Sequence, residues 1–366
     1  MKNRAEVRID LEALAHNISH AKSGGTAEVL AVVKANAYGH GLIPVAQAAL
    51  ASGATWLGTA LLEEAFELRN AGINAPIIAW LTPPGAAFEK AIELNIDLSV
   101  PSVAILNQIS EASQKLGKRA RVHIEVDTGM TRGGLLEEWE EFLKLLPSAH
   151  VEVVGFWTHF ARADEPLSDY TQIQINVFEA KLLELQHAGC SPQIIHYANS
   201  AATLLSIGID QKMVRLGIAM YGLSPDIGFM GHSAALGLRP VMSIAAQLHL
   251  VKKVPAGSPV GYGGTAVTER ETVLGVVAMG YSDGIPRNAS SATGVTHNGK
   301  RAPIIGRVSM DQFVVDLGPD STAQAGDEVL VISQTGYTAD DWASASGTIN
   351  YEIVTRIAAR VPRISV

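Results

Sequence analysis

Eight short apolar runs follow one another through the first two-thirds of the chain, most of them separated by a segment with helical spacing. The runs are Val29–Val33, Trp56–Ala60, Ile77–Trp80, Asp97–Val100, Ala120–Val126, Val151–Thr158, Gln193–His196 and Met213–Leu216. Alternating strands and helices imply parallel strands, and eight such units predict a closed (β/α)8 barrel of the TIM type. An open doubly wound sheet is the alternative, which the lack of a G-x-G-x-x-G motif after the first run disfavours.

The segments on either side of these runs are patterned differently. A first helix is predicted from Leu11, after the N-cap candidate Asp10, to a stop at Gly24 and Gly25. Beyond Gly231, turns rich in Gly, Pro, Asp and Asn separate short β-type runs. These runs are Ser243–Val251, Thr272–Ala278, Arg301–Val308, Gln312–Leu317 and Glu328–Ile332, and the only clear helix among them is Tyr351–Ala359.

Two domains are therefore expected. The barrel is assigned to residues 10–233 and a mostly β C-terminal domain to residues 234–366, joined by a strand from residues 1–9. The 366 residues suit this division, because a barrel of this type takes about 250.

Composition narrows the class of function. The net charge is −8 with no basic run, which argues against nucleic acid or anionic lipid as a partner and favours a small molecule. Cys190 is the only cysteine, so an internal disulfide and a multi-cysteine metal site are excluded, and no metal is expected. The N-terminus lacks the apolar core of a signal peptide, and no apolar run approaches the roughly 20 residues of a membrane span. We expect a cytoplasmic protein.

A lysine ends the first apolar run. Lys34 follows Val33 directly, and Asn36, Tyr38 and Gly39 come next in a segment suited to a tight turn. In an α/β barrel the carboxyl ends of the strands are where chemistry is done. A lysine beside apolar walls loses its proton more easily than one in water, which suits it to form an imine with an aldehyde cofactor. A lysine reaching from a strand end to solvent is the alternative.

Other strand ends carry further polar residues. Alternation along the fifth run directs His123, Glu125 and Asp127 into the barrel. A lone histidine or arginine of this kind is more often a core or surface residue, but several at one rim indicate a site. The residues predicted to converge at the rim are Lys34, Arg132, His159, His196 and Arg215.

The loops after the seventh and eighth runs are suited to a phosphate. Asn199 and Ser200 begin a helix, whose free N–H groups and dipole stabilise an anion, and Gly217 to Gly222 offers open backbone. Asn-Ser is equally an ordinary N-cap. Together with Lys34, these loops predict a phosphorylated aldehyde cofactor.

The chain resembles the alanine racemases, which belong to the fold-type III enzymes that use pyridoxal 5'-phosphate. The resemblance rests on nine sequence blocks that occur in the family's order. They are Ala31–Gly41, Asp127–Arg132, Thr158–Phe160, His196–Ser200, Val214–Ile218, Val260–Gly263, Gly280–Gly284, Gly306–Asp311 and Ile349–Glu352. It implies a barrel that binds the cofactor, a β-rich second domain, and a homodimer in which that domain closes the partner's site.

By the same resemblance, Lys34 and Tyr262 are the two catalytic bases, and Tyr262 comes from the partner subunit. Racemisation needs a base on each face of Cα. His159 and Arg215 would help Tyr262 act near neutral pH, and Arg215 would face the pyridine nitrogen. The resemblance implies cofactor binding by Lys34, Tyr38, Arg132, His159, Asn199, Ser200, Arg215, Gly217, Ile218 and Tyr351.

Substrate binding is implied for Arg132 and for the backbone N–H of Met310. Supporting roles are implied for Glu125, His196, Tyr281 and Asp311. Tyr281 and Tyr351, together with Arg287, would narrow the entrance to a small side chain.

Two positions depart from the family pattern. Ser309 stands where many members have cysteine, and Glu125 stands where many have a lysine carbamylated by carbon dioxide. We expect Glu125 to hold Arg132 with a permanent carboxylate, through a long or water-bridged contact.

The expected function is the interconversion of L-alanine and D-alanine, either to supply D-alanine for peptidoglycan or to catabolise alanine. One alternative is a racemase of broader specificity for serine or basic amino acids, which Tyr281 and Tyr351 disfavour. The other is a non-catalytic pyridoxal-phosphate carrier, which Tyr262 and the second domain disfavour.

Overall fold

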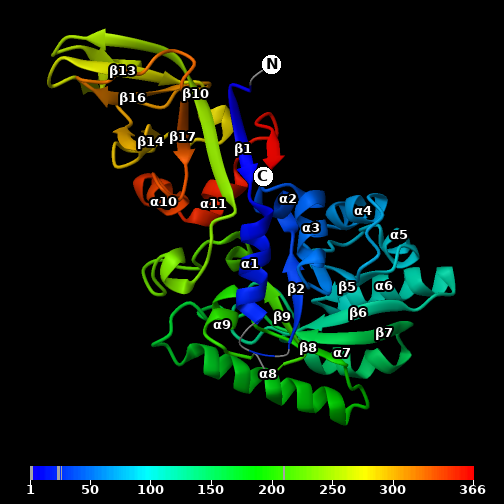
Figure 1. Cartoon of the computed structure of the whole chain (residues 1–366). Helices are drawn as coiled ribbons and strands as arrows, with labels where there is room; N and C mark the ends of the chain where they lie inside the picture. Colours follow the sequence, from blue (N-terminus) through cyan, green and yellow to red (C-terminus); the bar gives the residue numbers. More distant parts are fainter. Residues whose placement is uncertain (1–2, 23–24, 26, 209–210) are drawn as a thin grey trace. The chain divides into compact units, whose positions relative to one another are not determined.

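A computed structural model describes residues 3–22, 25, 27–208 and 211–366 (Figure 1). Contacts divide the chain into two compact units. The barrel unit comprises Glu12–Ala37 and Leu42–Arg239, and the C-terminal unit comprises Met1–Leu11, Tyr38–Gly41 and Pro240–Val366. Gly24 of the predicted helix stop and residues 1 and 2 of the predicted first strand lie outside the described residues.

The barrel unit contains eight parallel strands in the order β8-β7-β6-β5-β4-β3-β2-β9. Their bounds are β2 Glu28–Val32, β3 Trp56–Thr59, β4 Ile77–Ala79, β5 Ile96–Val100, β6 Ala120–Glu125, β7 Val151–Trp157, β8 Ile194–His196 and β9 Met213–Leu216. The predicted (β/α)8 barrel is confirmed, and each predicted run overlaps one of its strands. The backbone N–H of Arg215 donates to the carbonyl of Ala198 at 2.9 Å, which links β9 to the segment after β8.

The strands are buried on both faces. Every residue of β3 and of β5 is buried, although β5 contains Asp97 and Ser99. Parallel strands covered by helices are apolar along most of their length, so a buried polar residue among them needs a partner. The positions of Asp97 and Ser99 therefore bear on the site described below.

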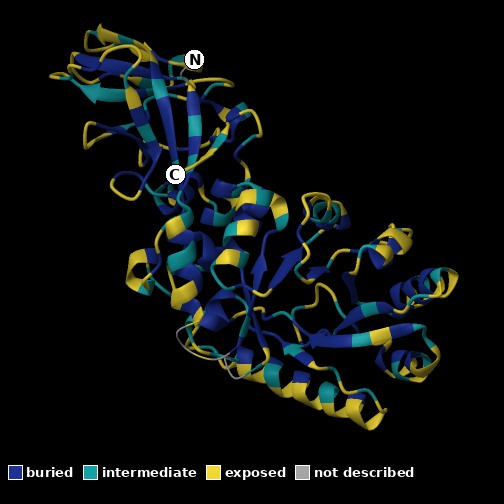
Figure 2. Ribbon diagram, turned by 45° about the vertical axis from the view of Figure 1, so that its right-hand side comes forward, coloured by how far each residue is buried: buried dark blue, intermediate teal, exposed yellow. Residues whose placement is uncertain are grey.

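Helices cover the outside of these strands, with their outward faces exposed and their inward faces buried (Figure 2). The helices of this part of the chain are α1 Leu11–Lys22, α3 Leu42–Ala51, α4 Leu62–Asn70, α5 Phe88–Glu93, α6 Val103–Leu116, α7 Trp139–Leu145, α8 Tyr170–His187 and α9 Ser200–Leu204. Helix α6 shows how the sequence determines where a helix begins and ends. Ser102 caps its first turn by accepting from the N–H of Ile105 at 3.3 Å, and Gly117 ends it in the left-handed conformation at φ 62°.

The C-terminal unit is mostly β, as predicted. Its strands are β1 Ala5–Ile9, β10 Met242–Val254, β11 Pro259–Val260, β12 Ala266–Val267, β13 Thr272–Val277, β14 Gly294–His297, β15 Lys300–Pro303, β16 Phe313–Gly318, β17 Glu328–Ile332 and β18 Arg363–Ser365. The long strand β10 organises them. It pairs antiparallel with β1, β17 and β13. The pairing with β13 begins at Leu248, and its register shifts between Leu248 and Leu250.

Three predictions for this unit were wrong in detail. Helix α10 (Ala339–Ser346) was not predicted, because its sequence is polar, but Thr338 and Asp341 form a capping box at its start. Helix α11 (Asn350–Thr355) ends four residues before the predicted Ala359. The predicted run Arg301–Val308 holds only the strand β15, which ends at Pro303, a residue with no N–H to donate.

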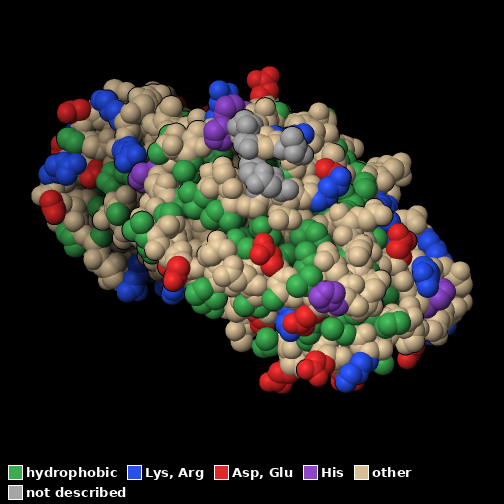
Figure 3. Space-filling view, turned by 90° about the horizontal axis from the view of Figure 1, so that it is seen from below, with side chains coloured by type: hydrophobic (Ala, Val, Ile, Leu, Met, Phe, Trp, Pro, Cys, Tyr) green, Lys and Arg blue, Asp and Glu red, His purple; other side chains and the backbone are tan. Residues whose placement is uncertain are grey.

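The surface and the helices add two observations. On the face seen in Figure 3, basic and acidic side chains of the described residues are interspersed rather than gathered by sign. Within residues 3–22, 25, 27–208 and 211–366, no helix has both the length and the apolar character needed to cross a membrane.

Candidate active site

Lys34 follows β2 at the carboxyl end of the barrel strands, and the backbone after it adopts a left-handed helical conformation. Helix α2 (Lys34–Tyr38) has φ values of 54°, 54° and 53° at Ala35, Asn36 and Ala37, and 52° at Tyr38. A left-handed conformation costs a non-glycine residue roughly 1–2 kcal/mol, so four in a row must be held by their surroundings.

A carboxylate holds the start of this left-handed turn. Glu64, in α4, accepts from the N–H of Ala35 at 2.5 Å. Its other oxygen accepts from the N–H groups of Ala60 and Leu61 at 3.0 and 3.1 Å. At the other end, the side-chain oxygen of Asn36 accepts from the N–H of Leu42 at 2.8 Å. The backbone beside Lys34 is thus fixed from two sides.

The environment of Lys34 favours its neutral form. Burial lowers the pKa of Lys34, the charges of Arg132 and Arg215 lower it further, and Glu64 partly opposes them. A neutral amine is the form that attacks a carbonyl or accepts a proton. The turn beside Lys34 and its depressed pKa together fit a reactive amine.

Arg215, on β9, is a buried cation without a carboxylate partner in the described part of the chain. Only 3% of its surface is exposed. Nη1 donates to the carbonyl and to Nδ1 of His196 at 2.9 and 3.1 Å. Nη2 lies 2.9 to 3.2 Å from the carbonyls of Thr158 and Tyr197 and from Nδ1 of His159.

The remaining donor of Arg215 is available for a ligand. Its four terminal N–H groups face protein acceptors, and among the described residues no acceptor lies within hydrogen-bond distance of Nε. Burial lowers the pKa of Arg215 to about 9, so the side chain remains a cation at neutral pH. Trp157 lies beside it, with the guanidinium carbon 5.1 Å from the ring centre.

His159 and His196 are held in their neutral forms. Burial and the charges of Arg215, Arg132 and Lys34 lower the pKa of His159 well below its usual range. Burial, Arg215 and His123 lower the pKa of His196 in the same way. Neither is arranged as part of a metal centre, since no group of three or more His, Cys, Asp or Glu in the described residues could hold an ion.

Glu125 lies inside the barrel near Arg132. The two side chains form no direct ion pair within 4.0 Å, and the partner that the structure gives Glu125 is the Ser99 hydroxyl at 3.4 Å. Burial raises the pKa of Glu125 to about 7, although Ser99 and the charges of Arg132 and Arg215 lower it. Glu125 is therefore only partly ionised at neutral pH, whereas a permanent carboxylate was expected, and its role toward Arg132 stays a prediction. Arg132 itself is exposed on the turn after β6.

The predicted phosphate loops lie against each other. Ser200 Oγ accepts from the N–H groups of Gly217 and Ala219 at 2.9 and 3.3 Å. Asn199 acts as the N-cap of α9, because its side-chain oxygen accepts from the N–H of Ala202 at 3.0 Å. The Ser200 hydroxyl proton and the first N–H of the 3₁₀ turn η2 (Ile218–Tyr221) have no partner from within these turns. Together they form a compact set of donors.

The C-terminal unit carries the other predicted residues. Tyr262, in the 3₁₀ turn η4 (Tyr262–Gly264), is 71% exposed. The rings of Tyr38 and Tyr351 lie 6.3 Å apart. Gly39, next to Tyr38, must be glycine, since a Cβ there would lie 2.2 Å from the carbonyl oxygen of Val354. Arg287 lines a cavity of about 540 Å³ in this unit together with Arg270 and Arg307.

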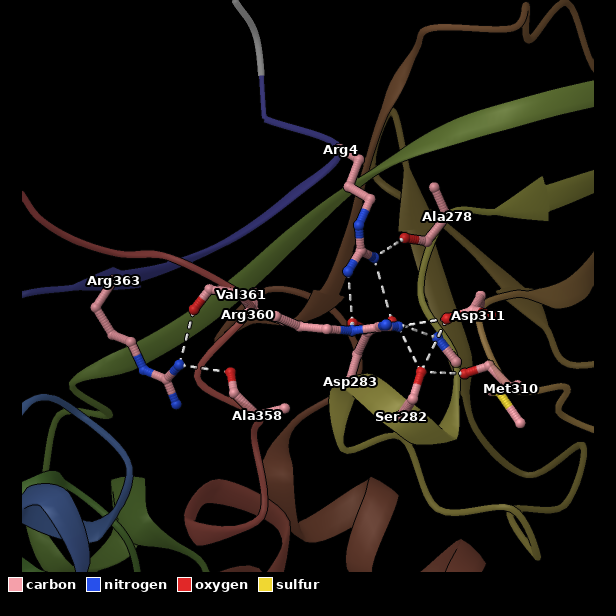
Figure 4. A network of polar contacts seen from close by, with 11 residues as sticks. Arg4, Ala278, Ser282, Asp283, Met310, Asp311, Ala358, Arg360, Val361 and Arg363 are labelled. Atoms are coloured by element: carbon pink, nitrogen blue, oxygen red, sulfur yellow. Dashed lines mark hydrogen bonds and ion pairs between the residues drawn. The ribbon is translucent and has the colours of Figure 1, made fainter.

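Tyr281 and Met310 lie on two loops bound to each other. The N–H of Tyr281 donates to the carbonyl of Ser309 at 3.0 Å, and the N–H of Ser282 donates to that of Met310 at 2.9 Å. Figure 4 shows the side chain of Arg360 extended between Asp283 and Asp311, which belong to these loops. The N–H of Met310 has no partner among the described residues, so it can still donate.

Two family models match nearly the whole chain. One, described as the N-terminal domain of alanine racemase, matches residues 9–225, and the other, described as its C-terminal domain, matches residues 241–365. The chain belongs to the alanine racemase family.

Individual relatives agree over their full length. An alanine racemase of Salinispora tropica is 47% identical over 370 residues, 98% of each chain, and one of Thermobifida fusca is 46% identical over 373 residues, covering 100% and 98%. The crystal structure of alanine racemase from Streptomyces lavendulae has a TM-score of 0.95 at 44% identity and covers 100% of this chain and 98% of its own. That of Bacillus anthracis with bound L-Ala-P has a TM-score of 0.92 at 39% identity, covering 100% and 96%.

Two residues of the site were missed from the sequence. Glu64 sits in a helix among other acidic residues, and no pattern indicates that it reaches Ala35. Asp97 could have been found, because Asp97 and Ser99 alternate with Ile96, Leu98 and Val100 and so share the inner face of β5.

Proposed function

We propose that this protein interconverts L-alanine and D-alanine with pyridoxal 5'-phosphate bound at the rim of the barrel. The observation that carries the proposal is the pairing of a lysine of lowered pKa with a buried arginine whose Nε–H is available. Membership of the alanine racemase family supports it independently.

The donor set fits the cofactor. Lys34 supplies the amine that binds its aldehyde, Arg215 a donor for its pyridine nitrogen, and Ser200 with the loop from Gly217 and Ile218 supplies donors for its phosphate. Tyr38, Tyr351, His159 and Asn199 complete the binding residues in this proposal. When bound, the pyridoxal ring accepts the electron pair left on Cα when its proton is removed.

Two bases act on opposite faces of the substrate Cα. Lys34, released from the cofactor when the substrate amine replaces it, takes the proton on one face. Tyr262 of the partner subunit takes or returns the proton on the other, which requires a homodimer with shared sites. The exposure of Tyr262 in this chain supports a role beyond its own unit. His159, neutral and bonded to Arg215, is suited to exchange a hydrogen bond with the phenol.

Arg215 sets how strongly the ring attracts electrons. Because it remains cationic and offers Nε–H as a donor, it would disfavour protonation of a pyridine nitrogen held beside it. Return of the proton at Cα would then be favoured, which would limit transamination. Arg132 and the N–H of Met310 hold the substrate carboxylate, and Glu125 tunes the charge beside Arg132.

Alanine is preferred to larger amino acids because Tyr281 and Tyr351 narrow the entrance. We also propose that the protein is cytoplasmic and that its product is D-alanine for peptidoglycan, or that it catabolises alanine.

The test is a racemase assay on a panel of L-alanine, L-serine and L-lysine, run beside a visible spectrum of the purified protein. We expect a yellow protein that converts L-alanine fastest. Faster conversion of serine or lysine would support the broader racemase. A yellow protein that leaves all three optically unchanged would support the carrier.

A further inference from the structure

A chain of hydrogen bonds runs through the barrel from Arg215 to Asp97. Nη1 of Arg215 lies 3.1 Å from Nδ1 of His196, and Nε2 of His196 lies 3.0 Å from Nδ1 of His123. Nε2 of His123 then lies 3.2 Å from Oδ2 of Asp97. Both imidazoles are fully buried, and the side chain of Asp97 is 2% exposed. The four side chains come from β9, β8, β6 and β5.

The groups at its two ends determine which atom donates in every hydrogen bond of this series. A guanidinium can only donate, so Nδ1 of His196 must accept and the ring proton must sit on Nε2. That proton is donated to Nδ1 of His123, which therefore carries its own proton on Nε2 and donates it to Asp97. Each link depends on the next, and the carboxylate at the end can only accept.

Asp97 is kept ionised at the far end. Burial raises the pKa of Asp97, but hydrogen bonds from His123 and Arg121 and the charge of Arg121 outweigh it, so the pKa lies below its usual value. Arg121 donates to both carboxylate oxygens, at 2.9 and 3.1 Å. Its side chain is 37% exposed, so Arg121 connects the buried carboxylate to the surface.

The rings cannot easily turn to reverse the chain. Trp157 stacks on His196 with an interplanar angle of 5° and a centroid distance of 5.9 Å, and Trp56 makes a T-shaped contact with His123 at 74° and 5.6 Å. His123 also fills space that only glycine leaves at position 155, where a Cβ would lie 2.0 Å from Nδ1. Packing therefore fixes the orientation of both imidazoles.

We propose that Asp97 and His123 are positioning residues, which act through His196 to hold Arg215 with its Nε–H directed at the bound cofactor. This rests on the proposed function, in which Arg215 faces the pyridine nitrogen. The carboxylate controls the arginine by fixing the tautomers of the two histidines between them.

Asp97→Asn leaves the direction of the hydrogen-bond chain unfixed. Because Arg121 donates to both oxygens of Asp97, the substituted amide can present either its oxygen or its NH2 group to His123. When the NH2 group faces His123, the protons of His123 and His196 move to Nδ1, where His196 meets the N–H of Arg215 and the two opposed donors displace Arg215. We expect kcat to fall at least about threefold, with KM changed much less, since the loss concerns a charge-assisted hydrogen bond that matters after substrate is bound.

Three further variants separate this effect from simple structural damage. Glu152→Gln removes an exposed partner that lies 3.6 Å from Arg121 and leaves the hydrogen bonds of Asp97 intact, so kcat should change less than about twofold. His123→Gln can still accept from His196 through its oxygen and donate to Asp97 through its NH2 group, so it should retain most activity. His123→Leu cannot, and it should lose about as much kcat as Asp97→Asn.

The direct readout is solid-state ¹⁵N NMR of holoenzyme carrying ¹⁵N-histidine, which distinguishes protonated from unprotonated ring nitrogens. Signals of His123 and His196 are assigned by their loss in the His123→Gln and His196→Gln variants. We expect both rings to be protonated on Nε2 in the wild type and in Glu152→Gln, and a fraction of each ring to be protonated on Nδ1 in Asp97→Asn.

A wild-type His196 protonated on Nδ1, or unchanged tautomers and kcat in Asp97→Asn, would overturn the inference. If Asp97→Asn fails to fold, the contrast between His123→Gln and His123→Leu decides, and equal kcat in these two would overturn it. If the wild type carries the stated tautomers but does not racemise alanine, the proposed function fails and the control of Arg215 by Asp97 stands.

Discussion

Arg215 in the barrel unit and Asp283 in the C-terminal unit are both buried charges, but their surroundings satisfy them differently. Asp283 is 0% exposed and accepts from Arg4, from Arg360 and from the N–H of Gly280, at 2.6, 2.6 and 2.9 Å (Figure 4). Arg215 faces carbonyls and imidazoles, with no carboxylate within 4.0 Å among the described residues.

The difference separates a structural charge from one kept for a ligand. A buried carboxylate paired with two cations has its charge balanced within the protein, and its role is to join the segments it contacts. A buried cation that faces only neutral acceptors keeps its charge and one N–H for something else. Arg215, Arg132 and Lys34 are the cations of the barrel rim, and together they suit an anionic ligand.

The largest expected effect concerns Lys34. Lys34→Ala should abolish the visible absorbance of lysine-bound cofactor and lower turnover by at least about 10³-fold, because the cofactor attachment and one of two bases are lost together. The matched control is Lys212→Ala, an exposed lysine that pairs with Glu28 at 3.5 Å and should leave both unchanged. Native turnover by Lys34→Ala without an added amine would show that Lys34 neither holds the cofactor nor acts as a base.

The next largest effect concerns Asp283, the buried carboxylate that is paired with two arginines. Asp283→Asn should lower the free energy of unfolding at pH 7 by about 2–4 kcal/mol, since it leaves two arginines facing a neutral group. The control is Asp311→Asn, which removes an exposed partner of Arg360 and should lower the free energy of unfolding much less than Asp283→Asn does. Urea unfolding measures both, and equal losses would mean that burial does not distinguish the two carboxylates.

The pairing of Asp283 with Arg4 and Arg360 also predicts how the stability of the protein depends on pH. Hydrogen bonds from Arg4 and Arg360 outweigh burial and lower the pKa of Asp283. A carboxyl group whose pKa is lower in the folded protein stabilises it above the unfolded pKa and loses that contribution as the pH falls through the folded value. The wild type should therefore lose stability below about pH 4 more steeply than Asp283→Asn, as measured by urea unfolding across pH.

The smallest effect concerns Glu125, whose pKa is raised, whereas that of Asp283 is lowered. Its pKa is raised from 4.5 to about 7, so its contribution to stability is complete below pH 4.5 and is lost as the pH rises to about 7. Glu125→Gln never ionises, and it should be more stable than wild type at pH 8 by about 1–3 kcal/mol in the cofactor-free protein, with a smaller difference at pH 5.

At pH 8, where Glu125 is ionised, the same variant should weaken substrate binding by roughly 1–3 kcal/mol, because Arg132 loses a nearby anion. Activity should not depend on bicarbonate in the wild type, while Glu125→Lys should recover part of the binding only when carbon dioxide is supplied. Glu140→Gln, an exposed change on α7, is the control. If Glu125→Gln binds alanine as the wild type does, Arg132 is held by another group.

The fold could be predicted from the sequence where burial controls the pattern. Apolar runs revealed all eight barrel strands, because strands covered on both faces are apolar along most of their length. The polar helix α10 could not be found in this way, since its stability comes from its cap and from Trp342, which is 1% exposed. Neither could the left-handed turn at Ala35, which depends on the distant Glu64.

The site was predictable where function places a lone charged residue at a strand end, as at Lys34 and Arg215. It was not predictable where partners lie in other elements. The protonation of Glu125 depends on how deeply it is buried, and the partners of Asp97 lie on β6. Residue type indicates what a side chain can do, whereas contacts across strands determine its charge.

The central claim is that Lys34 and Tyr262 serve opposite faces of the substrate. It is tested most directly by primary isotope effects with Cα-deuterated L-alanine and D-alanine, measured separately for the wild type and for Tyr262→Phe. We expect the variant to slow proton removal from L-alanine far more than from D-alanine, and to raise the isotope effect only in the L-to-D direction. Equal slowing with unchanged isotope effects in both directions would contradict the account and make Tyr262 a structural residue.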